Sequence, residues 1–358
     1  MKNKNYKNVF LTSTMALILA ASLSSGCSKL NNLTDSKKQP ETVSKKQAEP
    51  APKKQGKFVA VVADSNKAAY SIDGIKWTMT TMPENAVWLG VAHGNSKFVA
   101  VAADSNKAAY SYDGINWKMT TLPYKARWHS ICYGNGRFLA IAGETTVRDG
   151  YDDDRSDKAA YSEDGINWTA TKMPGREEWG KIAYGGGKFV VVTTGGPHSS
   201  GEPSGKAAYS ADGIKWETVT LPVKVFWNSI CYGNNMFVAV DFFSNNVAHS
   251  KDGINWFKAR MPQEDGWHSI CYGNGRFVAM GFFYMGPVRA AYSTDGINWE
   301  TVIMPSEAKW NSPCFGNGKF VVLTYGDDIA AYSNDGIKWT ETKMPVVADW
   351  TGVCYGGE

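Results

Sequence analysis

One short pattern, Ser-x-Asp-Gly-Ile-x-Trp, recurs seven times along the chain and limits the folds that the chain can adopt. Its copies begin at Ser71, Ser111, Ser162, Ser210, Ser250, Ser293 and Ser333. A second tryptophan recurs between the copies, at Trp88, Trp128, Trp179, Trp227, Trp267, Trp310 and Trp350. These two series account for all 14 tryptophans of the chain. Such self-similarity is typical of repeat architectures, in which each repeat is one supersecondary unit.

Each repeat contains four short strand signals separated by turn residues, as residues 128–172 illustrate. Strands are predicted over 128–133 and 138–142 around a Gly-Asn-Gly turn, and over 158–162 and 168–172 around the Asp164-Gly165 turn. Pro174 predicts the end of the fourth strand, because proline cannot donate to a ladder. Four antiparallel strands in each of seven repeats predict an all-β fold, a seven-bladed β-propeller over residues 56–358.

The two ends of the repeated region complement each other. Residues 350–356 match a first strand with no repeat after it, and the region begins at 57 with the sequence of a second strand. We expect the C-terminal strand to pair with the N-terminal blade and to close the ring, since closure removes free sheet edges. We also expect this unit to be a monomer.

The repeated turn resembles the Asp box of sialidase-like propellers, Ser-x-Asp-x-Gly-x-x-Trp, with one residue fewer between Asp and Gly. The resemblance covers residues 56–358, and such boxes occur in sialidases, glucanases and sortilin-like receptors. It implies a folding element in which Ser and Asp side chains cap a tight turn. We therefore assign no catalytic residue and interpret as structural turn residues Asp73, Asp113, Asp164, Asp212, Asp252, Asp295 and Asp335.

The N-terminal segment has the features of a bacterial lipoprotein signal. Residues 1–26 combine Lys2, Lys4 and Lys7 with an apolar stretch, and they end at Gly26 before Cys27. This resembles a lipobox, which implies lipidation of Cys27 and an extracytoplasmic protein anchored to the membrane. Simple secretion by cleavage is the alternative. Residues 27–55 are rich in Lys, Pro, Gln and Ser, so we expect a disordered linker there.

The net charge of +4 comes from this N-terminal part. Residues 1–26 carry +3 and residues 27–55 carry +4, so subtracting both from +4 leaves −3 on the repeated region. A domain that interacts with nucleic acid usually carries a basic patch or stripe. The repeated region therefore predicts no nucleic-acid partner.

Five cysteines follow Cys27, each four residues after a second-series tryptophan: Cys132, Cys231, Cys271, Cys314 and Cys354. Ala92 and Ala183 take the same place in the other two repeats. Equivalent positions on different blades are expected to lie beyond disulfide reach, and alanine at this place indicates a small packing residue. We therefore predict free, buried thiols and no zinc site.

Sequence variation among the repeats separates two faces of the predicted propeller. The turns between first and second strands and between third and fourth strands are nearly constant, whereas the other connections vary. Variable loops on a rigid scaffold are where binding usually resides.

Polar residues after the second-series tryptophans are expected to surround the channel mouth, and aromatic residues occupy two equivalent loops. The candidate ligand-binding residues are His129, Asn228, His268, Asn311, Phe243, Phe283 and Tyr284. Channel water is the alternative role for the polar residues, and core packing is the alternative for the aromatic segments.

One variable loop is acidic, with Asp149, Asp152, Asp153, Asp154 and Asp157. Clustered carboxylates can bind Ca²⁺, although the spacing does not match an EF-hand loop. A solvated acidic loop is the alternative, and we predict no other cofactor.

These observations favour a membrane-anchored binding or scaffold protein whose variable face binds a glycan or a protein. The alternative is a glycoside hydrolase of the sialidase-like type, and a pair of carboxylates from distant loops would serve that chemistry. The chain has only eight arginines and no Arg-Ile-Pro segment, so the arginine clamp implied by a sialidase is not recognisable.

Overall fold

A computed structural model of the chain describes residues 55–143, 155–194, 203–282 and 288–357, with the side chain of Phe282 left out. These residues belong to the second of two compact units, Pro52–Glu358. Every regular element in the described ranges is a strand. In those same ranges no helix is long and apolar enough to cross a membrane.

Sixteen of the strands form four separate sheets of four antiparallel strands. One contains β7 (Trp128–Gly134), β8 (Arg137–Ala142), β9 (Ser156–Ser162) and β10 (Thr169–Glu177). The next contains β11 (Trp179–Gly185), β12 (Lys188–Thr193), β13 (Lys206–Ser210) and β14 (Glu217–Thr220). The third contains β15 (Trp227–Gly233), β16 (Met236–Asp241), β17 (Asn246–Ser250) and β18 (Phe257–Arg260). The fourth contains β19 (Gly266–Gly273), β20 (Arg276–Phe282), β21 (Arg289–Ser293) and β22 (Glu300–Ile303).

The remaining strands form one nine-stranded sheet instead of separate four-stranded sheets. Its order is β23 (Trp310–Gly316), β24 (Lys319–Ser333), β25 (Thr340–Gly356), β1 (Lys57–Val62), β2 (Ser65–Ser71), β3 (Thr78–Gly94), β4 (Lys97–Ala103), β5 (Ser105–Ser111) and β6 (Lys118–Ala126). The sheet is continuous because β3 and β25 each run from the fourth strand of one repeat into the first strand of the next. Strand β24 likewise runs through the second and third strands of a single repeat. Within it, β25 pairs antiparallel with β1, with Phe58 opposite Tyr355 and Ala60 opposite Val353.

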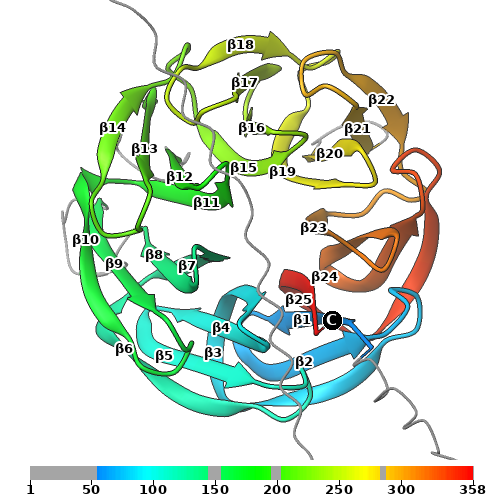
Figure 1. Ribbon diagram of the computed structural model, residues 1–358. Coiled ribbons are helices and arrows are strands. Elements are labelled where there is room, and N and C mark those ends of the chain that lie inside the picture. Colours follow the sequence, from blue (N-terminus) through cyan, green and yellow to red (C-terminus); the bar gives the residue numbers. More distant parts are fainter. Residues whose placement is uncertain (1–54, 144–154, 195–202, 283–287, 358) are drawn as a thin grey trace, which may run out of the picture. The chain divides into compact units, whose positions relative to one another are not determined.

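The sheets are arranged radially around a central axis (Figure 1). In this view β7, β11, β15, β19 and β23 lie nearest the axis, and β10, β14, β18 and β22 lie at the periphery. The innermost strands begin at or next to the second-series tryptophans, so we call them the inner strands. The second halves of β3 and β25, from Trp88 and Trp350 onward, have the same sequence pattern.

The four strands predicted for residues 128–172 are found as β7 to β10, but the prediction that Pro174 ends the last strand is wrong. Strand β10 continues through Pro174 to Glu177. The ladder is interrupted there, since Lys172 lies opposite Lys158 and the next pair is Glu177 with Ser156. Proline is tolerated at such an irregularity because no ladder hydrogen bond is required of it.

The second-series tryptophans form the centre of the packing, because all seven have 0% exposure. In six of them the indole N–H donates to the backbone carbonyl four residues earlier, as in Trp128 Nε1 to Tyr124 O at 3.1 Å and Trp179 Nε1 to Gly175 O at 2.9 Å. A buried indole N–H usually finds such a partner. The bond holds the connection that enters each inner strand.

Glycines at the ends of the inner strands allow close packing between neighbouring sheets. A Cβ added to Gly94, Gly134 or Gly233 would overlap the ring of Tyr133, Tyr184 or Tyr272 on the next inner strand. A Cβ added to Gly356 would likewise overlap the ring of His93. Only glycine leaves room for these rings.

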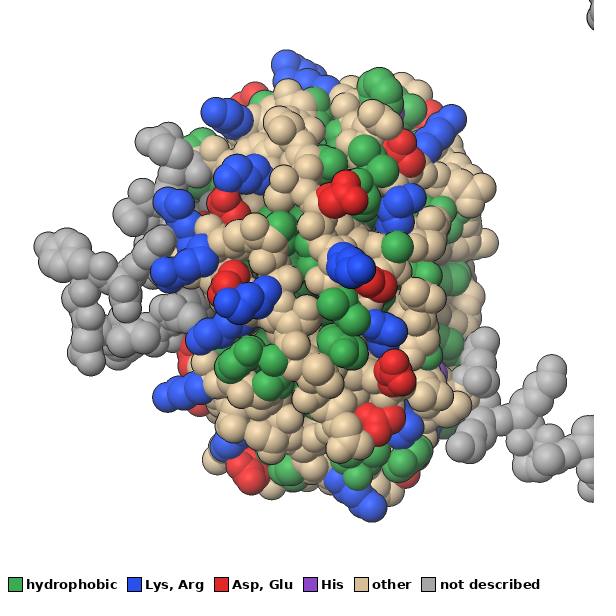
Figure 2. All heavy atoms as spheres, turned by 60° about the vertical axis from the view of Figure 1, so that its left-hand side comes forward, with side chains coloured by type: hydrophobic (Ala, Val, Ile, Leu, Met, Phe, Trp, Pro, Cys, Tyr) green, Lys and Arg blue, Asp and Glu red, His purple; other side chains and the backbone are tan. Residues whose placement is uncertain are grey.

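The periphery carries charges of both signs. Figure 2 shows the flank on the left of Figure 1, where Lys and Arg side chains are interspersed with Asp and Glu side chains. No extended surface of a single sign is visible in this view.

Candidate functional site

The strand pairings separate the two ends of the sheets. Trp227, at the start of an inner strand, lies opposite Asp241 at the end of β16. The connections between second and third strands therefore emerge at the end where the inner strands begin, and we call this the variable face. Phe138 lies opposite Ser162, so the Ser-x-Asp-Gly turns and the Gly-Asn-Gly turns share the other end of the sheets. We call the former the Asp-box turns, and this end the Asp-box face, after the motif that the sequence resembles.

On the Asp-box face, one carboxylate oxygen of each of the seven repeated aspartates accepts the same three hydrogen bonds. In one of them Asp164 Oδ1 accepts the N–H groups of Ile166 and Asn167 at 2.8 Å and the Ser162 hydroxyl at 2.9 Å. Gly165 has a φ of 73°, which glycine adopts without strain. Burial raises the pKa of such a carboxyl, but the hydrogen bonds outweigh it and lower the pKa to about 2 at Asp113. These groups are ionised caps of a turn.

Asparagines of the Gly-Asn-Gly type turns connect neighbouring sheets on the same face. Asn135 Nδ2 donates to Ala211 O at 3.1 Å, and Asn274 Nδ2 donates to Asn334 O at 3.0 Å. Asn317 makes the corresponding bond to Ile72 O at 3.3 Å, across 245 residues of sequence. The constant residues of this face are therefore occupied with structural contacts.

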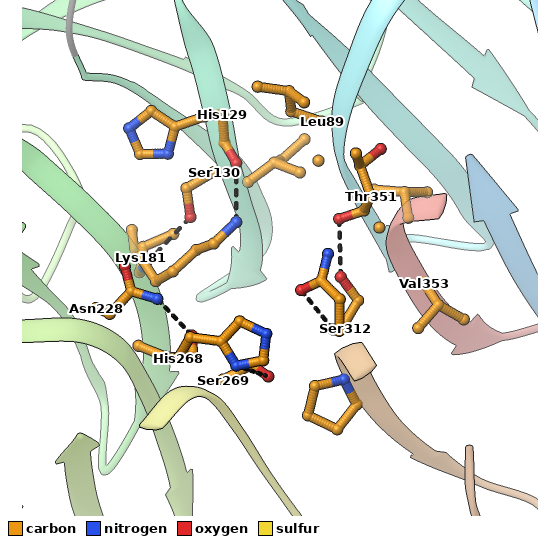
Figure 3. Close-up of a pocket in the computed structure, with 18 of the residues that line it drawn as sticks. Leu89, His129, Ser130, Lys181, Asn228, His268, Ser269, Ser312, Thr351 and Val353 are labelled. Carbon is orange, nitrogen blue, oxygen red and sulfur yellow. Dashed lines mark hydrogen bonds between the residues drawn. The ribbon is translucent and has the colours of Figure 1, made fainter. Parts of the chain in front are cut away.

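A cavity of about 300 Å³ lies between the inner strands (Figure 3). It is lined by three consecutive residues from most of these strands, beginning with the residue after each tryptophan. Four of the predicted ligand-binding residues are brought together in this lining: His129, Asn228, His268 and Asn311. The cavity lining contains no aspartate or glutamate among the described residues.

These polar side chains also join neighbouring inner strands. The His129 ring donates from Nε2 to Trp179 O at 2.9 Å, and Asn228 Nδ2 donates to His268 O at 2.6 Å. Thr351 Oγ1 donates to Trp88 O at 2.6 Å. Some of the donors that were expected to bind a ligand are thus engaged in hydrogen bonds between neighbouring inner strands.

The sequence analysis missed Lys181, which lies in the cavity lining on β11. Its ammonium donates to His129 O at 3.2 Å (Figure 3). A signal was present, because Ser130, Ser229, Ser269 and Ser312 occupy this place on other inner strands and a lysine breaks the pattern. Burial lowers the pKa of Lys181.

Burial also decides the charge state of the two cavity histidines. It lowers the pKa of His129 to about 3, with a further contribution from the positive charge of Lys181. Burial also lowers the pKa of His268. Both rings are therefore neutral near pH 7. Among the described residues that line the cavity, Lys181 is the one lysine or arginine.

The five cysteines are free and lie beyond the tryptophans on the inner strands, where Cys271 is buried and the other four are half-buried. Burial raises the pKa of Cys132 and Cys314 to about 12, so these thiols stay protonated. Cys231 packs against one hydrophobic core cluster and Cys354 against another. A buried, protonated thiol is a packing group and a poor nucleophile.

A second cavity, of about 290 Å³, adjoins the first on the variable face. Its lining is Phe242, His268, Lys309, Asn311 and Tyr325, so it shares two residues with the central cavity. Tyr325 is 45% exposed, and burial together with the Asp349 carboxylate raises its pKa. The variable face thus presents an aromatic pocket that continues into the polar channel.

Phe243, which was predicted as a ligand contact, is 47% exposed beside this pocket. Its ring packs edge-on against Phe242 and Phe226, with centroids 4.7 and 5.1 Å away. The loop is held because the Phe243 N–H and the Ser244 hydroxyl both donate to the Asp241 carboxylate. Phe283 and Tyr284 lie outside the described residues.

Most of the predicted calcium ligands also lie outside the described residues, namely Asp149, Asp152, Asp153 and Asp154. Asp157 is described, and its carboxylate lies 3.5 Å from the ammonium of Lys172. Within the described ranges, no three His, Cys, Asp or Glu side chains are grouped so that they could hold a metal ion. Cys27 lies outside these ranges as well.

Comparison with solved structures decides the fold class. A catalytically inactive virginiamycin B lyase from Staphylococcus aureus with quinupristin matches with a TM-score of 0.63 and 13% identity, over 80% of this chain and 91% of that one. YCF48 bound to D1 peptide matches with a TM-score of 0.53 and 14% identity, over 73% and 82% of the two chains. Apo AztD from Citrobacter koseri matches with a TM-score of 0.50 and 13% identity, over 85% and 99%.

The unit is a β-propeller. At 13 to 14% identity these likenesses establish the fold and leave the function open. No protein-family model and no curated protein sequence matches the chain.

Proposed function

We propose that this protein is an extracytoplasmic binding protein that uses the variable face of its propeller to hold a protein or peptide partner. The observation that carries the proposal is the junction of two cavities at His268 and Asn311. One cavity is polar and the other is lined by Phe242 and Tyr325, with Phe243 exposed beside it. Concave sites with an apolar wall and a few convergent polar groups are typical ligand sites.

The choice of a protein partner over a glycan draws on YCF48, a propeller that was solved with a bound peptide. A glycan partner is the competing outcome. A glycoside hydrolase would need a pair of carboxylates, and the described lining of the two cavities supplies no Asp or Glu. We therefore place binding ahead of hydrolysis.

We further infer that the propeller has seven blades and is closed by the pairing of β25 with β1. In this interpretation the nine-stranded sheet comprises three blades that are joined through the long strands β3 and β25, while β24 runs through the second and third strands of one blade. Successive inner strands contact one another in the order β3, β7, β11, β15, β19, β23 and β25, and β25 contacts β3. The Thr342 hydroxyl donates to Ile75 O at 2.7 Å, as the Thr80 hydroxyl donates to Ile115 O at 2.6 Å on a neighbouring repeat.

Residues 1–26 are proposed to direct export, Cys27 to carry the lipid, and residues 27–55 to hold the propeller away from the membrane. We keep as a proposal that the acidic loop around Asp157 binds Ca²⁺. Neither proposal enters the argument for the binding face.

The test is to screen the purified protein on peptide and glycan arrays and to measure the affinity for the best ligand. Phe243→Ala and Tyr325→Ala should each weaken binding by about tenfold or more, because exposed aromatic anchors carry much of the energy of such contacts. The matched control is Phe257→Ala, which removes an aromatic side chain with 61% exposure from the outer strand β18. Equal affinity of all three variants with the parent protein would refute the proposed face, and binding confined to glycans would replace the protein partner.

A further inference from the structure

Three equivalent positions on neighbouring inner strands form a belt of hydrogen-bond donors in the central cavity. They are Ser130 on β7 and Lys181 on β11, both labelled in Figure 3, and Ser229 on β15. The Ser130 oxygen accepts the Ile182 N–H at 3.2 Å, and the Ser229 oxygen accepts the Ile270 N–H at 3.3 Å. A hydroxyl that accepts in this way keeps its own hydrogen for donation.

Lys181 adds a positive charge to this belt. Its ammonium has three N–H donors, and one of them is directed to His129 O at 3.2 Å. Neither the cavity lining nor the ion pairs found in the described ranges offer it a carboxylate. Lys181 is half-buried, and removing an ammonium from water without a counter-charge costs free energy, so its pKa is lowered. An anion in the cavity would remove this cost.

We propose that Lys181, with the hydroxyls of Ser130 and Ser229, binds the carboxylate group of a ligand inside the channel. The charge balance selects a carboxylate. Lys181 is the one Lys or Arg of the described cavity lining, and His129 and His268 are neutral near pH 7. A carboxylate matches the single positive charge of this lining, whereas a phosphate dianion would exceed it, and Lys309 belongs to the adjoining pocket.

The inference rests on the proposed function, because it assigns a chemical group to the ligand of the same face. The cavity shares His268 and Asn311 with the aromatic pocket, so a ligand whose carboxylate enters the channel can extend over Phe242 and Tyr325. Two sources of such a carboxylate are a peptide and a sugar acid. N-acetylphenylalanine represents the first and glucuronate the second.

The experiment follows the ε-methylene signals of ¹³C-labelled lysines in the full-length protein in detergent, with the Lys181 signal identified by its loss in Lys181→Met. Each carboxylate is titrated against sodium chloride of equal ionic strength. We expect a saturable shift of the Lys181 signal with at least one carboxylate and a raised pKa of its ammonium, since a bound anion favours the charged form. Chloride should produce neither effect.

Affinities measured by calorimetry provide the second readout. Lys181→Met should weaken carboxylate binding by about tenfold or more, and Ser130→Ala or Ser229→Ala should weaken it less, because a charged donor contributes more than a neutral one. Lys76→Met, at an exposed turn lysine on the Asp-box face, should leave it unchanged. An unshifted Lys181 signal with both carboxylates, equal affinity in Lys181→Met, or tighter binding of inorganic phosphate would each overturn the proposal.

The outcome separates this inference from the proposed function. In one outcome, the Lys181 signal shifts saturably while Phe243→Ala and Tyr325→Ala leave the affinity for the partner unchanged. This result would support the carboxylate site and refute the proposed partner face. Alternatively, partner binding depends on Phe243 and Tyr325, but neither carboxylate shifts the Lys181 signal. This result would refute only the carboxylate site. Tighter binding of N-acetylphenylalanine than of glucuronate would support a peptide as the source, and the reverse would support a sugar acid.

Discussion

At the scale of single residues, the repeated aspartates differ in one detail that has a measurable consequence. Asp164 Oδ2 accepts the Asn167 amide at 2.8 Å, a bond that Asp73 lacks because Lys76 replaces the asparagine. In Asp164→Asn an amide N–H₂ can face the amide of Asn167, so a donor meets a donor. Denaturant unfolding should show a loss of about 1–2 kcal/mol for Asp164→Asn and a smaller loss for Asp73→Asn.

Because the Asp-box turns lie away from the proposed site, both variants should keep the affinity of the parent protein for its ligand. Loss of binding in Asp164→Asn at an unchanged melting temperature would place the function on the Asp-box face. In that case the assignment of the binding face would be inverted.

His129 makes stability depend on pH. Its folded-state pKa of about 3 lies below the ordinary value of 6.5, so between these values the unfolded chain binds more protons than the folded one. The stability from this ring is therefore present above pH 6.5 and is lost as the pH falls towards 3, by up to about 1.4 kcal/mol for each pH unit. His129→Asn should remove this slope, since Asn228 shows that an asparagine can bond to the next inner strand.

The measurement is urea unfolding at several pH values between 6.5 and 3.8, above the range in which carboxylates take up most of their protons. The parent protein serves as the control for the remaining groups. Identical pH slopes in parent and variant would show that His129 does not titrate as its burial implies.

At the scale of elements, the contacts between inner strands depend on glycines that the repeat conserves within the chain. A Cβ at Gly233 would overlap the Tyr272 ring, so Gly233→Ala must displace that ring or separate two strands. Overpacking of this kind costs about 1–3 kcal/mol. Gly175→Ala is the control, because a Cβ there meets no atom within 4 Å. Similar melting temperatures for the two variants would contradict the tight packing.

At the scale of the whole molecule, the pairing of β25 with β1 is the contact by which we propose that the propeller closes. Deleting residues 350–358 removes buried Trp350 and leaves β1 without a partner on one side. We expect a lower melting temperature and a tendency to associate through the exposed edge, to be measured by calorimetry and size-exclusion chromatography. An unchanged melting temperature in a monomeric product would show that closure contributes little.

The proposed membrane anchor can be tested on the same scale. Labelled palmitate should enter the protein in bacterial cells, and Cys27→Ala should abolish the labelling because the thiol is the attachment point of a lipoprotein. Cys132→Ala, at a half-buried cysteine of the propeller, is the control and should label normally. Labelling that persists in Cys27→Ala, or that is absent from every form, would contradict the anchor.

The strands of most repeats, the capped turns and most of the positions that line the central cavity could be predicted from the sequence. These features depend on neighbours within a few residues, as Ser162, Asp164 and Gly165 show. Lys181 was visible only as an irregularity in a repeat, because its significance lies in the carbonyl of His129, 52 residues away. The continuation of β10 past Pro174 was also missed, since it depends on pairing with Ser156.

The packing of the repeats determines which polar groups form hydrogen bonds between inner strands and which remain available in the cavity. His129 and Asn228 were predicted as ligand contacts, and each also bonds to the backbone of a neighbouring inner strand. The junction of Phe242 and Tyr325 with His268 and Asn311 likewise joins residues of separate strands and loops. The physical reason is that local turn chemistry is encoded within one repeat, whereas a cavity exists only where the packing of several repeats leaves space between them.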